Sequence, residues 1–219
     1  MTATSPQTRD AAAARTRLNE IDAELRRLRG APPTPLARPE PLSPETARAV
    51  LSLLAESAVH HVVVNEADHA RRAIGDAIAL MTDTTDPATA ARASLLMGET
   101  LIELDSAKHA EDQLQRAVQF YDRVGDKKLA SRARLALGRA MVLLDQPAGM
   151  DLLQQVLDDY LATADVAGVA RVQTIFAELN RGADAAETIR AGYGRSVSML
   201  PLPPTKPPPG RGGSMPPRR

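Results

Sequence analysis

A ten-residue sequence pattern occurs twice in the chain, once starting at Gly98 and once starting at Gly138, and this recurrence limits the possible folds more than any other feature. Residues 98–107 read GETLIELDSA and residues 138–147 read GRAMVLLDQP. Each copy of the pattern begins with a glycine, continues through an apolar stretch and is interrupted by an aspartate. A recurrence after about 40 residues indicates a repeat architecture, in which one supersecondary unit is copied along the chain.

Further residues recur at nearly the same interval. Three aspartates are each followed by an arginine after six positions and by a small residue after twelve: Asp86, Asp126, Asp165; Arg92, Arg132, Arg171; Gly98, Gly138, Ala177. The same step taken back from Gly98 reaches Ala58, and residues 68–78 overlay residues 108–118. The spacing therefore predicts four units in one register. A small residue in the first helix of each unit lets the second helix cross closely.

The composition predicts that these units are helical. Aromatic residues make up 2% of the chain, and alanine, leucine, arginine, glutamate and glutamine, which favour helices, are abundant. The chain has no cysteine, which excludes a disulfide framework and cysteine-ligated zinc, and its formal net charge is zero. The expected fold class is all-α.

The prolines divide the chain into four parts. Of 17 prolines, six lie in residues 31–44 and eight in residues 201–217. Proline lacks a backbone donor, so both stretches are expected to be extended and not helical. We therefore predict an N-terminal amphipathic helix (1–30), a proline-rich linker (31–43), a helical repeat domain (44–192) and a disordered, basic, proline-rich tail (193–219).

The N-terminal helix carries a short apolar seam. Ala11, Ala14, Leu18, Ile21, Leu25 and Leu28 follow the 3, 4 spacing of a coiled coil. Two interpretations stay open for this seam: the helix folds back onto the repeat domain, or residues 8–29 mediate self-association.

The repeat resembles the tetratricopeptide repeat, whose helix pair carries a small residue at its eighth position and alanines at its twentieth and twenty-seventh. With Ala91 as the first position, Gly98, Ala110 and Ala117 fall on these three. In the next unit Gly138 fits, while Met150 and Leu157 stand where alanines are expected, and Ser94 and Arg134 replace the family's bulky fourth residue. The resemblance covers about residues 44–192 and implies a right-handed superhelix of about four helix pairs, in the longer-repeat type.

The resemblance also implies a site. The family holds a peptide or helix of another protein in a concave groove lined by the first helices. The equivalent groove-facing residues here include Arg92, Leu95, Glu99, Arg132, Leu135, Arg139 and Arg171. One arginine per unit forms a ladder that suits an acidic peptide or helix. In the alternative interpretation these arginines are solvated, or they pair with Glu99 and Glu178 within the chain.

Other functions find less support in the sequence. The four histidines are expected at the surface without a metal, no motif for catalysis or a cofactor is present, and the apolar runs are too short to span a membrane. We expect a non-enzymatic, cytoplasmic adaptor or scaffold from a bacterium. The alternatives are a regulatory or chaperone-type subunit for a single client protein and, with less support, a nucleic-acid-associated factor that uses the basic tail.

Overall fold

The computed structural model describes residues 6–29, 42–81, 86–179 and 181, and every regular element in these ranges is a helix. The predicted all-α class is confirmed for this part of the chain. The helices are α1 (Pro6–Arg29), α2 (Pro44–Val63), α3 (Ala67–Met81), α4 (Pro87–Glu103), α5 (Ala107–Val124), α6 (Lys127–Leu143) and α7 (Ala148–Ala162), followed by a helical segment at 166–179.

The chain divides into two compact units, Met1–Gln173 and Thr174–Arg219. The first unit holds α1 to α7 and residues 166–173. In the second unit, the described residues 174–179 and 181 are helical. The predicted tail (193–219), the last residues of the predicted repeat domain (182–192) and most of the predicted linker lie outside the described residues.

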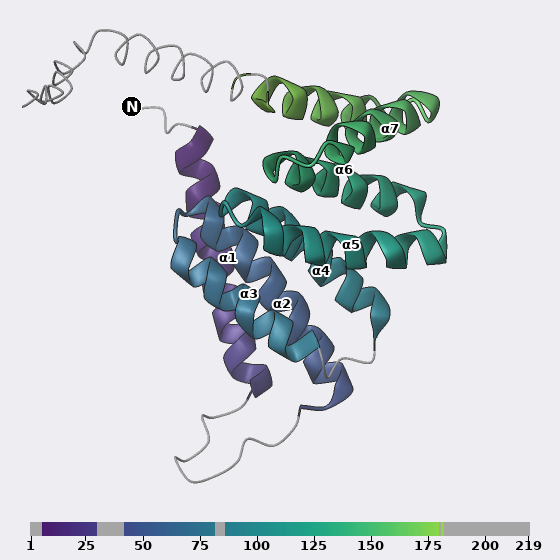
Figure 1. The fold of residues 1–219 in the computed structure, drawn as a ribbon. Helices are drawn as coiled ribbons and strands as arrows, with labels where there is room; N and C mark the ends of the chain where they lie inside the picture. Colours follow the sequence, from purple (N-terminus) through teal and green to yellow (C-terminus); the bar gives the residue numbers. More distant parts are fainter. Residues whose placement is uncertain (1–5, 30–41, 82–85, 180, 182–219) are drawn as a thin grey trace, which may run out of the picture. The chain divides into compact units, whose positions relative to one another are not determined.

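The helices of the first unit pack as successive pairs (Figure 1). α2 packs on α3, α4 on α5 and α6 on α7. The backbones of the first helices α2, α4 and α6 also approach one another in series, whereas the backbones of the second helices α3, α5 and α7 do not. Among the described helices, contacts join only adjacent pairs, which is compatible with a helical repeat and differs from a closed bundle.

The interval seen in the sequence has a direct counterpart in the backbone. Asp86, Asp126 and Asp165 each accept a hydrogen bond from a backbone N–H of the helix that follows, so all three are N-caps of first helices. At the other end of the first helices, Asn65, Asp105 and Asp145 have φ between 55° and 63°. Asparagine and aspartate adopt this left-handed conformation more readily than most residues. The repeated interval therefore marks where each first helix begins and ends.

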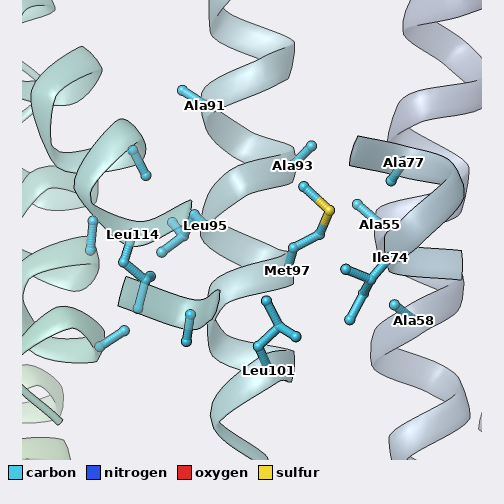
Figure 2. Close-up of a cluster of buried hydrophobic side chains, with 14 of the residues drawn as sticks. Ala55, Ala58, Ile74, Ala77, Ala91, Ala93, Leu95, Met97, Leu101 and Leu114 are labelled. Carbon is cyan, nitrogen blue, oxygen red and sulfur yellow. The ribbon is translucent and has the colours of Figure 1, made fainter. Parts of the chain in front are cut away.

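Small residues lie where helices cross, as predicted. Ala58, Ala70, Ala77, Ala110 and Ala117 are all fully buried. Figure 2 shows Met97 of α4 pointing toward Ala55 and Ile74 of the preceding pair, so larger side chains fill the space that the alanines leave. The core is thus shared between adjacent pairs.

The third pair keeps the pattern with a shift of one residue, which corrects the predicted alignment of Met150 and Leu157 with the family's alanines. Gly149 N donates to Gln146 O, three residues back, whereas Ala110 N donates to Ser106 O, four residues back. This tighter turn removes one residue, so Gly149 is the counterpart of Ala110. A methyl group at Gly149 would lie 2.7 Å from Val142 N, which shows that the close approach recurs here.

The N-terminal helix folds back onto the repeat. Ala14, Leu18 and Ile21 of α1 are buried, and α2 is the only described helix that α1 contacts. Arg17 donates from Nε and Nη2 to Glu56 Oε1 and Oε2 at 2.7 and 3.0 Å. In the structure the helix thus adopts the first of the two arrangements considered for the seam. Self-association through residues 8–29 stays a prediction and would have to compete with this packing.

Candidate partner-binding site

Each ladder arginine lies in the second turn of a first helix, six residues after the aspartate that caps it. Arg92 lies on α4, Arg132 on α6 and Arg171 on the helical segment at 166–179. Arg92 and Arg171 are exposed and form no ion pair or hydrogen bond with any described residue. The two outer members of the ladder therefore present unengaged guanidinium groups.

Arg132, the middle member, is already engaged. It donates from Nε and Nη2 to Glu99 Oε1 and Oε2 of α4 at 2.7 and 2.6 Å. This bidentate hydrogen bond raises the pKa of Arg132, so the group stays charged across the accessible pH range. The interpretation in which Glu99 pairs within the chain is confirmed for Arg132.

A second ion pair joins the same two helices. Arg139 Nη1 lies 2.5 Å from Glu103 Oε1, one turn further along α4 and α6 than the first pair. Both pairs link successive first helices across their polar side. Ion pairs that are this exposed each add at most about 1 kcal/mol of stability, so their main effect is to set which groups face one another.

Leu95 and Leu135 lie in the interior, which corrects the expectation that they face an open groove. Their residual exposures are 2% and 6%. Burial of a leucine side chain contributes about 1.5–3 kcal/mol. Packing between neighbouring helices therefore covers both leucines, and the accessible part of the predicted site consists of its charged residues.

Two tyrosines that the sequence analysis did not single out belong to the same region. Tyr121, near the end of α5, and Tyr160, near the end of α7, occupy equivalent places in successive pairs and are 4% and 5% exposed. Neither hydroxyl forms a hydrogen bond with a described residue. The sequence contained one signal for these residues, because two of the chain's three tyrosines are separated by about one repeat interval.

Charges of the ladder surround both tyrosines. Burial raises the pKa of Tyr121, as does Asp126, while Arg92 and Arg132 act in the opposite direction. Burial likewise raises the pKa of Tyr160, against the effect of Arg171 and Arg132. Arg132 thus acts on both tyrosines, each of which lies within electrostatic reach of two ladder arginines. Both hydroxyls stay protonated at neutral pH and are available as donors.

The polar residues that replace the family's bulky fourth position also have partners. Ser94 Oγ donates to Gln113 Oε1 at 3.3 Å inside the second pair, and Arg134 Nη2 lies 2.5 Å from Asp122 Oδ1 of α5. Hydrogen bonds between helices thus stand in for apolar packing at these positions.

The histidines do not gather into a metal centre. No group of three or more potential ligands occurs among the described residues. His69 and His109 are exposed as expected, whereas His61 is half-buried, stacks on His69 at 5.1 Å and lies 2.8 Å from Glu66 through its Nδ1. None of the described helices combines the length and apolar character needed to cross a membrane.

Comparison of the chain with protein-family models and with curated proteins finds no match. The candidate site therefore rests on the geometry described above.

Proposed function

We propose that the protein is a non-enzymatic adaptor of the cytoplasm that binds a segment of another protein along its first helices. We further propose that its repeat is of the tetratricopeptide type and winds into a right-handed superhelix. One observation carries this proposal: the backbones of the first helices approach one another in series, whereas those of the second helices do not. Such contacts are expected when first helices line the inner side of a curved array, where an elongated partner is held.

The chemistry of the first helices supports a polar contact with a partner. The apolar residues at the expected groove positions, Leu95 and Leu135, are buried, so a partner meets Arg92, the Glu99–Arg132 pair and Arg171. Charged contacts of this kind favour specificity and rapid association over high affinity. An adaptor that exchanges partners is consistent with such a surface.

Site-directed photo-crosslinking in the native host tests the proposal. A photoreactive amino acid replaces Arg92 of α4 in one full-length variant and the exposed Arg116 of α5 in a matched control. We expect one defined partner to be crosslinked from position 92 and not from position 116. Crosslinking of the same partner from position 116 alone would move the binding surface to the second helices and contradict the proposal.

The same experiment separates the adaptor from a factor that acts through its basic tail. Crosslinking from position 92 is repeated with a chain that lacks residues 193–219. The adaptor requires that the crosslink persists. Its complete loss would show that the tail, which contains Arg195, Lys206, Arg211, Arg218 and Arg219 and no acidic residue, carries the binding.

A further inference from the structure

Several hydrogen-bond donors along the ladder have no acceptor among the described residues. Three carboxylates of this region already accept hydrogen bonds: Asp126 from Leu129 N at 3.0 Å, Asp165 from Gly168 N at 2.9 Å and Glu99 from Arg132. The guanidinium groups of Arg92 and Arg171 have no acceptor among the described residues, nor do the hydroxyls of Tyr121 and Tyr160.

The two tyrosine hydroxyls are the most informative of these donors, because both tyrosines are buried. Exposed arginines are satisfied by water, but the hydroxyl of a tyrosine that is about 95% buried is normally hydrogen-bonded to protein or to an ordered water. Two equivalent tyrosines in successive repeats have no partner among the described residues. A single extended ligand with acceptor groups could serve both hydroxyls and the flanking guanidinium groups.

We infer that this ladder binds an acidic, extended segment of a partner protein, that Arg92 and Arg171 hold two of its carboxylates, and that Glu99 competes with the segment for Arg132. The inference rests on the proposed function and specifies its ligand. In the free protein Glu99 occupies Arg132 as a carboxylate of the partner would. Glu99 thereby weakens binding at the centre and leaves recognition to the two ends.

The spacing of the repeat predicts the spacing of the carboxylates. Packed helices lie about 8–10 Å apart, so Arg92 and Arg171, two first helices apart, are separated by roughly 16–20 Å. An extended chain rises about 3.3 Å per residue, which places the two carboxylates about five or six residues apart.

Charge complementarity favours an acidic peptide over a nucleic acid. A nucleic acid strand presents a phosphate at every nucleotide and needs a continuous run of cations. Here Glu99, Asp126 and Asp165 lie among the arginines and would repel such a strand. Separate carboxylates on an otherwise neutral peptide match the alternation of charge.

The test measures binding of a defined peptide to the full-length protein by fluorescence anisotropy. The probe is an extended serine–glycine peptide of about twelve residues with two glutamates about six residues apart, and the control peptide carries glutamine at both places. We expect the glutamate peptide to bind and the glutamine peptide not to bind. Double substitution of Arg92 and Arg171 by glutamine should weaken binding at least about tenfold.

Glu99→Gln provides a more specific test than the arginine substitutions. Because it removes the carboxylate that competes for Arg132, it should tighten peptide binding by about twofold to tenfold. Asp122→Asn is its matched control: it also removes one carboxylate from an ion pair with an arginine of α6, but that arginine, Arg134, is not among the expected groove residues and acts on neither tyrosine. We expect Asp122→Asn to change the affinity by less than about twofold. The double variant Tyr121→Phe with Tyr160→Phe should weaken binding about twofold to tenfold.

Several outcomes would overturn the inference. These are equal binding of the two peptides, no tightening by Glu99→Gln, equal tightening by Asp122→Asn, and displacement of the peptide by an oligouridine RNA. Circular dichroism melting of each variant confirms that it folds. Because the probe is synthetic, these outcomes are distinguishable from failure of the proposed function, which the crosslink from position 92 reports independently.

Discussion

The backbone of Gly98 in α4 lies directly against the side chain of Leu114 in α5. A methyl group at position 98 would lie 2.5 Å from Leu114 Cγ, and the same relationship recurs at Gly138, where a methyl group would lie 2.9 Å from Leu153 Cγ. The branch carbon of a buried leucine cannot move aside as the end of a flexible side chain can. The small residue of the repeat thus sets how closely the two helices of a pair approach.

Gly98→Ala is therefore expected to lower stability relative to Gly75→Ala. Both changes gain helix propensity of about 1 kcal/mol, but a methyl group at Gly75 of α3 meets nothing within 4 Å. The difference between the two variants isolates the crowding, which we expect to cost about 1–3 kcal/mol. Urea unfolding measures both free energies. Equal stabilities would show that Leu114 adapts and that the glycine is not required at the crossing.

A second prediction concerns the turns that join one pair to the next. Gly125 and Ala164 occupy equivalent places in successive turns, and both have positive φ, of 72° and 52°. An alanine in this conformation is strained, whereas glycine adopts it freely. Ala164→Gly should raise the free energy of unfolding by about 0.5–1 kcal/mol and Gly125→Ala should lower it by about 1 kcal/mol. A decrease in melting temperature for Ala164→Gly would mean that packing of its methyl group outweighs the strain.

Much of this arrangement was predictable from the sequence, because it depends on residue types at fixed intervals. The capping aspartates and the small residues at helix crossings follow from the interval alone. The sequence shows that the interval from Asp126 to Asp165 is one residue shorter than the one before it. The place of the shortening was not predictable, since it results from one backbone hydrogen bond that closes after three residues and not four. The tyrosines were missed because a ring near the end of a helix resembles an ordinary core residue. Burial of Leu95 depends on how closely first helices approach, which spacing does not specify.

A third prediction is a pH dependence centred on Glu111. This residue is 7% exposed, accepts from Lys108 Nζ at 2.8 Å, and lies 3.4 Å from Gln146 Nε2 in the turn before α7. The hydrogen bond from Lys108, with a smaller contribution from Gln146, holds the pKa of the Glu111 carboxyl below its ordinary value. A lowered folded-state pKa stabilises the protein above the unfolded pKa of about 4.3, and this contribution disappears as the pH falls through the lowered value.

Glu111→Gln should therefore lower stability by about 1 kcal/mol at neutral pH and reduce its decline between roughly pH 5 and pH 3. The adjacent, exposed Asp112 supplies the control Asp112→Asn. Thermal melting across this range measures both variants. If Glu111→Gln and the unsubstituted protein lose the same amount of stability as the pH falls, other carboxylates with a lowered pKa, such as Glu56 and Asp86, cause the loss.

The last prediction separates the two roles considered for the N-terminal helix. Ile21 of α1 is fully buried, and α1 contacts α2. If α1 covers the end of the repeat, Ile21→Asp should release it and expose apolar surface on α2, so the protein should self-associate more. If residues 8–29 instead form a coiled coil between copies, the same change should reduce self-association. Ala23→Asp, on the exposed side of α1, is the control. Static light scattering over a concentration series measures the mass, and we expect it to rise for Ile21→Asp alone, because the seam of a capping helix shields its neighbour from solvent.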